Sequence, residues 1–473
     1  MNGAGRKGED VMKIKVQIVI EHDELDEPIT EEIACLCRGD LLPEMMGLTL
    51  AEGKELLANM QAVMVRHQAE EYVDQQRYCS DCGKQYGKNG EHEIVWRSLF
   101  GKLRLHSPRF YTCRCRPRET KSFSPLAVLL PDRTAPELLY LQTKWASLMS
   151  YGLTTDLLAD TLPVNTSTRS VILNTQKVAE RMEEALGEEQ VMFAHGCPRD
   201  WADLPMPDGR ITVGLDGGFV HAREGDNRKA GWFEVIAGKS VTWEGEAKCF
   251  SFVHSYDEKP KRRLFEVLQS QGLQMNQDIT FLSDGGDTVR DLQFYISPWS
   301  EHVLDWFHIT MRLTVMKNIT TGLPSDPYLE TILDDLESVK WYLWHGNVFR
   351  ALEMLNLIED HLEIFEDEND VVHKLLRTVQ EFVGYIDVNN GFIPNYGERY
   401  RYGEAISTAF VESTINWVVS KRMVKKQQMR WTKRGAHLLL QTRTSTLNGD
   451  LRDTFCDWYP SMERTVENLP LAV

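Results

Sequence analysis

The sequence predicts a fold of the α+β or α/β class, in which a mixed sheet is interrupted by a helical insertion. Residues 211–307 alternate short, apolar, strand-like runs with helical runs, and residues 320–390 are acidic with helical spacing of apolar side chains. Before the sheet, four of the nine cysteines form two close pairs, and a long helical region follows them. We therefore expect a cysteine-rich module and a helical region in front of the sheet.

The composition is that of a folded protein. Of its 473 residues, 42% are hydrophobic and 26% are charged, which are ordinary globular proportions. No segment approaches the roughly 18–20 apolar residues of a bilayer-spanning helix, and the first ten residues lack the apolar core of a signal peptide. We expect a cytoplasmic protein without a membrane partner. In such a protein we expect close cysteine pairs to bind a metal ion rather than to form disulfides.

The N-terminal region is predicted to contain one strand and one long helix. Residues 14–22 alternate polar and apolar side chains, as in a strand, whereas 50–76 have helical spacing. Cys35 and Cys37 lie between them in an apolar run without partners, and we expect both to pack in a core.

A pair of helical runs within 134–186 resembles a helix-turn-helix. The runs are 155–161 and 167–182, joined by Leu162-Pro163-Val164-Asn165, and Asn165 or Thr166 is the expected N-cap of the second helix. A DNA-reading motif and a generic pair of packed helices have the same pattern, so both interpretations stay open.

The two cysteine pairs, Cys79-x-x-Cys82 and Cys113-x-Cys115, have the spacing of metal ligands. Such pairs on short turns supply a tetrahedral site for Zn²⁺, and residues 94–105 between them predict a hairpin with its turn near Phe100-Gly101. This is the arrangement of a zinc ribbon with a structural ion. The alternatives are free buried thiols, and a ribbon that does not contact DNA.

The net charge of −17 conceals two basic stretches. Residues 326–370 contain thirteen acids and two bases, 97–121 contain eight bases and one acid, and 421–443 contain eight bases and no acid. Basic runs bind DNA by displacing counterions from its phosphates. A solvated face is the alternative for each run, and Arg430 has the further alternative of packing on the core. The predicted DNA-binding residues, which would hold phosphates, are Arg104, Arg109, Arg114, Arg116, Lys421, Arg422, Lys425, Lys426 and Arg430.

The sheet is expected after a linker rich in proline and glycine at 196–209, in the order β-β-β-α-β-α-β-α. A further long helix, Thr408–Val424, follows the acidic insertion. The predicted strands are Ile211–Val220, Trp232–Lys239, Lys248–Tyr256, Asp278–Ser283 and His302–Phe307, and the predicted helices are Pro260–Gln271, Thr288–Ile296 and Ile309–Asn318.

Three acidic residues have surroundings unlike those of solvated carboxylates. Asp216 lies in an apolar strand next to glycines, Asp284 follows a buried strand, and Glu412 lies among apolar and hydroxyl residues of the last helix. Two strand acids and one helix acid around a β-β-β-α-β sheet form the layout of RNase H-like nucleases. In that layout carboxylates hold Mg²⁺ ions at a phosphodiester.

Each acid also has a separate structural explanation. Asp216 could cap a turn, and Asp284 could cap the helix predicted after it. Glu412 could pair with Lys421 or Arg422. The occurrence of all three acids in the expected order favours a common site over three separate explanations.

Blocks long enough to be specific lie at 304–313 (LDWFHITMRL), 406–414 (ISTAFVEST), 425–431 (KKQQMRW) and 434–441 (RGAHLLLQ). Together they resemble bacterial insertion-sequence transposases of the DDE type, in particular the ISKra group, whose catalytic domain is RNase H-like. The resemblance extends from about residue 78 onward, and residues 1–70 carry no motif that we can place.

The resemblance implies that DNA is cleaved at transposon ends by metal-activated water and joined to target DNA by the freed 3′ hydroxyl. It implies Mg²⁺ (or Mn²⁺) ligands at Asp216, Asp284 and Glu412. Asp305 and His308 match an auxiliary element, with His308 near the scissile phosphate or leaving oxygen; a core histidine is the alternative. Because paired end cleavage needs more than one subunit, we expect a homo-oligomer on DNA.

The predicted organisation has six parts, and the 127 residues between Asp284 and Glu412 require an insertion within the sheet domain. The parts are a strand–helix region at 1–76, a zinc ribbon at 77–121, a helical, helix-turn-helix-like DNA-binding domain at 122–195, the first part of the RNase H-like core at 210–317, the acidic helical insertion at 318–400, and the rest of the core with a basic tail at 401–473.

Three rival functions differ in what they require. A catalytically idle DNA-binding protein derived from a transposase would lose one of the acids, and all three are present. An RNase H-like structure-specific nuclease would not need the N-terminal modules or the long insertion. A hydrolase using Asp216 and Asp284 as acid and base, for example on sugars, would not depend on a metal.

Overall fold

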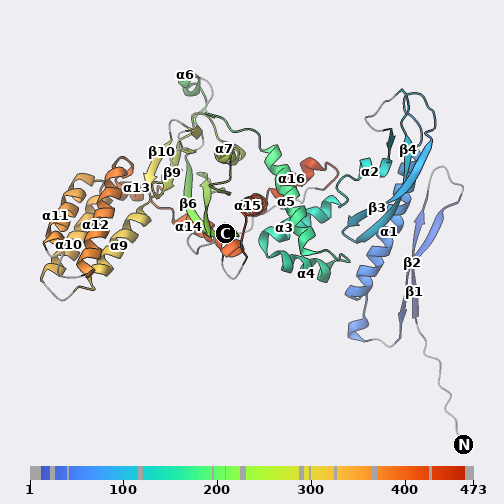
Figure 1. The fold of residues 1–473 in the computed structure, drawn as a ribbon, viewed down its shortest axis with the longest axis horizontal. Helices are drawn as coiled ribbons and strands as arrows, with labels where there is room; N and C mark the ends of the chain where they lie inside the picture. Colours follow the sequence, from blue (N-terminus) through green and yellow to red (C-terminus); the bar gives the residue numbers. More distant parts are fainter. Residues whose placement is uncertain are drawn as a thin grey trace, which may run out of the picture. The chain divides into compact units, whose positions relative to one another are not determined.

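The computed structural model describes residues 12–21, 27–39, 42–115, 121–193, 197–207, 209–223, 231–286, 292–293, 295–297, 300–323, 327–364, 370–424 and 429–463. This part of the chain mixes helices with strands in three separate sheets, as the α+β prediction expected (Figure 1). Two compact units are formed, Met1–Val178 with Leu451–Val466 and Ala179–Asp450 with Glu467–Val473.

The first unit begins with a hairpin against which one long helix packs. β1 (Met12–Ile20) pairs antiparallel with β2 (Ile29–Arg38), and α1 (Leu50–Gln75) follows a short 3-10 turn, η1 (Pro43–Met45). A capping box starts α1: the Glu52 N–H donates to Thr49 Oγ1 (3.2 Å) and the Thr49 N–H donates to Glu52 Oε2 (2.9 Å). The strand and the helix predicted here are confirmed.

Cys35 and Cys37 are exposed on β2, so the prediction that they pack in a core is wrong. The sheet has only two strands, and α1 packs against it. A bulge in the pairing at Val16/Gln17 changes which β2 side chains point inward. As a result, Ile33 beside the bulge is only 8% exposed, while the side chains of the two cysteines face solvent.

A three-stranded sheet carries the cysteine pairs. β3 (Lys88–Ser98) and β4 (Gly101–Tyr111) form an antiparallel hairpin, and β5 (Ser122–Phe123) pairs with the end of β4. The predicted hairpin is therefore present, with strands longer than expected. α1 and α2 (Pro125–Leu129) pack against β4 around a small core formed by Val73, Ile94, Leu105, Phe110 and Leu126.

The predicted helix pair is present with a different cap. α3 (Pro136–Leu148) precedes α4 (Tyr151–Thr161) and α5 (Thr168–Ala185), whose last turns belong to the second unit. The Ser170 N–H donates to Ser167 Oγ (3.2 Å), so Ser167 caps α5, and the prediction of Asn165 or Thr166 is wrong.

The chain returns to the first unit after residue 450. α16 (Leu451–Trp458) packs on α3, with the Arg452 guanidinium donating to both carboxylate oxygens of Glu137 (2.6 and 2.9 Å). The Phe455 ring also meets the Tyr140 ring edge-on at 5.6 Å. The domain prediction placed all of 401–473 with the sheet, and these contacts assign 451–463 elsewhere.

The second unit contains a five-stranded mixed sheet in the order β10-β9-β6-β7-β8. The first three strands form an antiparallel meander, and β9 and β10 are added in parallel beside β6. α6 (Pro198–Ala202) lies before the sheet, and α7 (Pro260–Ser270) joins β8 to β9. The strands are β6 (Ile211–His221), β7 (Trp232–Val241), β8 (Ala247–Val253), β9 (Ile279–Ser283) and β10 (Glu301–Leu304).

The sheet is held by a core of apolar side chains, and a helix lies along its outer strand. Val213 and Leu215 of β6 pack with Leu264 and Leu268 of α7 in this core. α15 (Lys433–Asn448) lies along β8, where Asn448 Oδ1 accepts from the Cys249 N–H (2.8 Å), so backbone groups of this edge strand are paired.

Two predicted elements end differently in the structure. The strand expected at 302–307 stops at Leu304, because Asp305 caps α9 (Trp306–Thr320) by accepting from the Phe307 N–H (2.8 Å). The helix expected at 408–424 is α14 (Ala409–Ile415) followed by a π-helix, η4 (Asn416–Val424). π-helical turns are rare and frequent at functional sites. The helix predicted at 288–296 falls largely outside the described residues.

The acidic segment is helical, as predicted, and shares its core with the sheet. α9, α10 (Pro327–Trp344), α11 (Val348–Glu363) and α12 (Asp370–Val388) lie side by side as a bundle (Figure 1). Two short helices follow, η3 (Asn390–Phe392) and α13 (Tyr396–Arg401). One buried cluster joins bundle residues to Leu282, Val303 and Leu304 of the sheet. Among the described helices, none combines the length and apolar character needed to cross a membrane.

Candidate active site and cysteine cluster

Three neighbouring parallel strands bring Asp216, Asp284 and Asp305 together: Asp216 lies within β6, and Asp284 and Asp305 directly follow β9 and β10. Gly214 of β6 pairs with Leu282 of β9, so two residues further along the strands Asp216 and Asp284 are opposite each other. Leu304 of β10 pairs with Ser283, and the Asp305 N–H donates to the Ser283 carbonyl oxygen (2.8 Å). Side chains at such strand ends converge on one edge of a sheet, where ligand sites of α/β proteins collect.

Asp216 is partly buried and lies in the field of three charged neighbours. Its Oδ1 accepts from the Gly217 N–H (2.7 Å). Burial raises the pKa of Asp216, and the nearby carboxylates of Asp284 and Asp305 raise it further, while the amide of Gly217 and His308 act in the opposite direction. A cation bound at this carboxylate would relieve the repulsion.

The helix that carries Glu412 packs on the face of β6 that Asp216 shares. Gly214, Asp216 and Gly218 lie on one face of the strand, because alternate residues of a strand point the same way. A Cβ added at Gly214 would overlap Val411 and lie 2.8 Å from Phe410 Cζ, and one at Gly218 would lie 3.4 Å from Ile415 Cγ2.

Glu412 lies between these contact points in α14. The backbone of Glu412 is thereby brought against the strand at Asp216, while its side chain is outside the described residues. Gly214 and Gly218, on either side of Asp216, make room for this helix.

Asp305 is a buried hub with no exposed surface. Besides the Phe307 amide, its carboxylate accepts from the Thr408 N–H (3.1 Å) and from the Thr408 hydroxyl. It also contacts His308 Nδ1 at 2.8 Å. Through these hydrogen bonds, Asp305 connects the start of α9 to the segment that precedes α14. The same carboxylate orients His308.

His308 is the basic group of the cluster. Its hydrogen bond to Asp305 raises the pKa of the imidazole, and the carboxylates of Asp284 and Asp216 add to the increase against the effect of burial. When Nδ1 donates its proton to Asp305, Nε2 is the nitrogen left to act on a ligand. The alternative of a core histidine is not favoured, since the ring is only half-buried and faces the acids.

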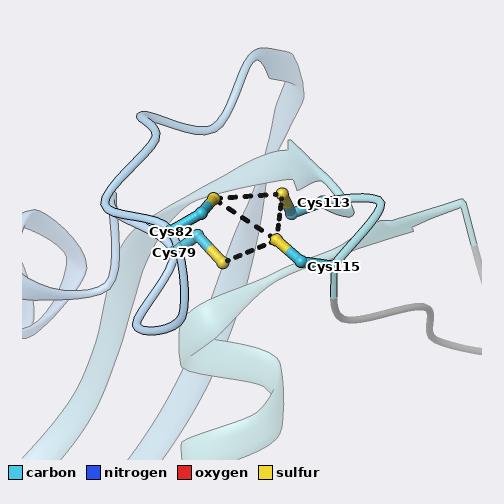
Figure 2. Close-up of side chains that lie close together, drawn as sticks. All are labelled: Cys79, Cys82, Cys113 and Cys115. Carbon is cyan, nitrogen blue, oxygen red and sulfur yellow. Dashed lines mark hydrogen bonds between the residues drawn. The ribbon is translucent and has the colours of Figure 1, made fainter.

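The four predicted cysteine ligands converge, as Figure 2 shows. Their sulfurs all lie within 4.8 Å of one another, and the Cys79–Cys115 and Cys82–Cys113 pairs are each separated by 3.6 Å. Four thiolates around a tetrahedral zinc with Zn–S bonds of ~2.3 Å have sulfur–sulfur separations of ~3.8 Å. The cluster could therefore hold a structural zinc ion, and Gly83, at φ +67°, makes the tight turn after the first pair.

Backbone amides stabilise the thiolate form of Cys79, which is the form that binds a metal ion. The N–H groups of Asp81 and Cys82 lower the pKa of the Cys79 thiol to about 6. Cys115 has the opposite shift, because hydrogen bonds with Cys113, Cys82 and Cys79 raise the pKa of its thiol. Four adjacent thiols cannot all ionise by themselves, and a divalent cation between them would allow it.

The predicted DNA-binding residues have different surroundings. Arg104 is exposed but forms an ion pair with Glu93 on the adjacent strand (3.2 Å), so acids of β3 offset part of the basic stretch. The side chains of Arg109, Arg114, Lys421 and Arg430 are exposed. Arg116, Lys425 and Lys426 lie outside the described residues.

The prediction that Arg422 contacts DNA phosphates is wrong, because its side chain is buried. Its side chain has no exposed surface and lies over the Trp431 ring, with the guanidinium carbon 5.3 Å from the ring centroid. It contributes to packing beneath η4 and does not reach a surface where a phosphate could bind.

A second cluster of ligand-type side chains was not predicted. Glu183, Asp257 and His437 have ligand atoms within 4.8 Å of one another. Arg263 lies among them and donates to Asp257 Oδ2 through Nε (3.0 Å) and to Glu183 Oε2 through Nη2 (3.0 Å). A guanidinium thus supplies the positive charge there. The residues are far apart in the sequence, so no local pattern could have identified the cluster.

Comparison with known proteins assigns no family. No protein-family model matches the chain, and no curated protein matches it either. The function must therefore be inferred from the sequence blocks and the geometry of the site.

Proposed function

We propose that this protein is a DNA transposase of the DDE type, with Asp216, Asp284 and Glu412 as ligands of catalytic Mg²⁺ or Mn²⁺. The observation that carries the proposal is the proximity of Asp216 and Asp284 on neighbouring strands, with the helix that bears Glu412 packed on the first of them. Asp216 lies within β6, Asp284 directly follows the parallel neighbour β9, and the helix bearing Glu412 packs on the face of β6 that Asp216 shares.

The order of the strands supports an RNase H-like core. An antiparallel meander of three strands is followed by a helix and by two parallel strands added beside the first. This agrees with the β-β-β-α-β layout in which carboxylates of a central strand, its parallel neighbour and a late helix meet.

The carboxylates would hold the metal ions, which would activate the attacking oxygen and neutralise charge on the phosphodiester. His308 would donate a hydrogen bond through Nε2, and its hydrogen bond to Asp305 raises the pKa of the imidazole. Asp305 is a positioning residue that orients His308 and anchors the segment before α14.

The first unit supplies features expected of a DNA-binding region. We propose that the cysteine cluster holds a structural zinc ion and that DNA contacts the ribbon and the α4–α5 helix pair. Arg109 and Arg114 are exposed candidates for phosphate contacts.

The decisive experiment compares wild-type protein with Asp216→Asn on DNA duplexes that carry the sequences flanking the reading frame. We expect Mg²⁺-dependent strand cleavage by the wild type and a loss of at least ~100-fold in the variant, because one metal ligand is removed. DNA binding in the absence of divalent metal should be retained.

A matched control is Asp278→Asn, which changes an exposed aspartate just before β9. It should cleave like the wild type. Undiminished cleavage by Asp216→Asn would refute the proposed site. DNA binding without cleavage by the wild type would favour the idle DNA-binding protein, and metal-independent hydrolysis would favour an acid–base pair.

A further inference from the structure

Arg312 is a basic residue beside the acidic site, within the block at 304–313, and no role was predicted for it. It lies on α9 four residues after His308, and residues with this spacing occupy the same face of a helix. Its side chain is half-buried, and its guanidinium carbon lies 4.2 Å from the centroid of the Tyr385 ring.

Tyr385 contacts both the Arg312 guanidinium and the backbone of Asp284. Tyr385 belongs to α12 of the helical insertion, and its hydroxyl donates to the backbone carbonyl oxygen of Asp284 (3.1 Å). Four residues later, the Asn389 side chain packs closely against Gly285. A Cβ added at Gly285 would lie 2.5 Å from Asn389 Oδ1. The insertion therefore holds the backbone at Asp284 and provides the surface on which the Arg312 guanidinium lies.

The guanidinium of Arg312 lacks an acidic partner in the described part of the chain. Within those residues it makes no hydrogen bond or ion pair, although Asp284 and Asp305 lie near enough to Tyr385 to affect its pKa. A guanidinium held over a ring by cation–π attraction spends none of its N–H groups on a hydrogen bond, so these groups can still donate. A planar set of donors of this kind suits a tetrahedral phosphate oxygen pair.

We propose that Arg312 binds a non-bridging phosphate oxygen of the DNA strand at the acidic site, and that Tyr385 holds its guanidinium in place. The inference rests on the proposed function, because the anion is taken to be a DNA phosphate. An acidic site repels a phosphodiester, and a fixed guanidinium beside it offsets that repulsion. The helical insertion is thereby part of the substrate-binding surface.

The test uses full-length Arg312→Gln and Arg312→Met, with Arg377→Gln as the matched control. Arg377 is an exposed arginine on α12 that pairs with Glu381 on the same helix. Affinity for flanking-sequence duplex DNA is measured in EDTA over a series of salt concentrations, and cleavage is then measured in Mg²⁺. Thermal melting establishes that each variant is folded, and Arg312→Met keeps an apolar stem on the tyrosine ring if the Gln variant is unstable.

Loss of one phosphate contact should reduce the slope of log affinity against log salt by about 0.9. We expect this change in both Arg312 variants, together with a fall in cleavage rate of about tenfold or more. The Arg377 variant should match the wild type in both measurements.

The outcomes separate the two proposals. If the wild type cleaves, Asp216→Asn does not, and a folded Arg312 variant keeps the wild-type slope and rate, then Arg312 is only a packing residue and this inference is overturned. If the wild type does not cleave but the salt slope still falls in the Arg312 variants, the phosphate contact stands and the transposase assignment fails.

Discussion

Arg263 supplies the positive charge in the cluster formed by Glu183, Asp257 and His437. It is 7% exposed and donates to both carboxylates and to Gln441 Oε1 (2.7 Å). These residues come from α5, the loop before α7, α7 itself and α15, so one side chain links segments separated by up to 178 residues. Removing one partner of a buried pair leaves an uncompensated charge, which is more damaging than the pair is stabilising.

Glu183→Gln should therefore destabilise the protein in a pH-dependent way. Burial alone would raise the pKa of Glu183, but His437 and Arg263 outweigh it and lower the pKa from 4.5 to about 2. Because the folded-state pKa is lowered, the stabilisation is complete above about pH 4.5 and is lost as the pH falls towards 2. At pH 7 we expect a loss of ~2–3 kcal/mol in the free energy of unfolding, measured with urea.

The matched control is Glu381→Gln, which breaks an exposed pair with Arg377. Its effect should stay within ~0.5 kcal/mol at every pH. A Glu183→Gln deficit that does not narrow between pH 5 and pH 3 would show that this carboxylate is not the titrating group.

At the scale of elements, the cysteine cluster fastens two turns that face each other across the ribbon. The first pair lies in the turn after α1 and the second follows β4, so the ion would join the two ends of one hairpin. In the described residues, the apolar cluster of the ribbon takes Ile94, Leu105 and Phe110 from the hairpin and Val73 and Leu126 from α1 and α2, and small cores commonly need a metal for stability.

Zinc removal should therefore unfold the ribbon. We expect about one zinc ion per purified chain, and none in this site after Cys82→Ser. Chelation should lower the free energy of unfolding of the first unit by at least ~3 kcal/mol, as followed by thermal melting and metal analysis. Cys35→Ser is the matched control, because it changes an exposed cysteine outside the cluster. Unchanged metal content in Cys82→Ser would eliminate the site.

At the scale of the whole molecule, the helical insertion shares its core with the five-stranded sheet. Its buried residues form one cluster with Leu282, Val303 and Leu304, and the Tyr396 hydroxyl donates to the Leu304 carbonyl oxygen (2.7 Å). A perturbation deep in the insertion is therefore expected to affect the sheet that carries Asp216 and Asp284.

Leu355→Ala tests this coupling in α11. Leu355 is fully buried, so truncation should lower the free energy of unfolding by ~2–5 kcal/mol. Far-UV circular dichroism and Mg²⁺-dependent cleavage should be lost at the same, lower denaturant concentration. Leu357→Ala, at a 49% exposed position of the same helix, should cost less than ~1 kcal/mol. Separate transitions for the helical signal and for activity would contradict a shared core.

Local patterns were sufficient to predict most elements and the four cysteine ligands. The alternation in 14–22 and the spacing in 50–76 reflect short-range periodicities of strands and helices, which each segment carries by itself. The turn near Phe100 and the Cys-x-x-Cys pair are equally local. Asp216 and Asp284 could be selected because an acid in or after an apolar strand is unusual in its own right.

Properties that depend on distant partners could not be predicted in this way. The bulge in the pairing of β1 with β2 turns Cys35 outward. Arg422 belongs to a basic run, yet the fold buries it over Trp431. In each case nearby residues have similar polarity, and the choice between them depends on which face other segments cover.

The sequence by itself determined the kinds of elements, the metal-type cysteine spacing and the acids worth testing, because these depend on periodicity and on the chemistry of adjacent residues. Only the tertiary structure decided that Asp305 is buried against Thr408, that Arg263 occupies an acidic cluster and that Arg312 lies on Tyr385. Thr408 lies 103 residues from Asp305, Glu183 lies 80 residues from Arg263 and Tyr385 lies 73 residues from Arg312. Such contacts arise from packing between elements, which no local pattern encodes.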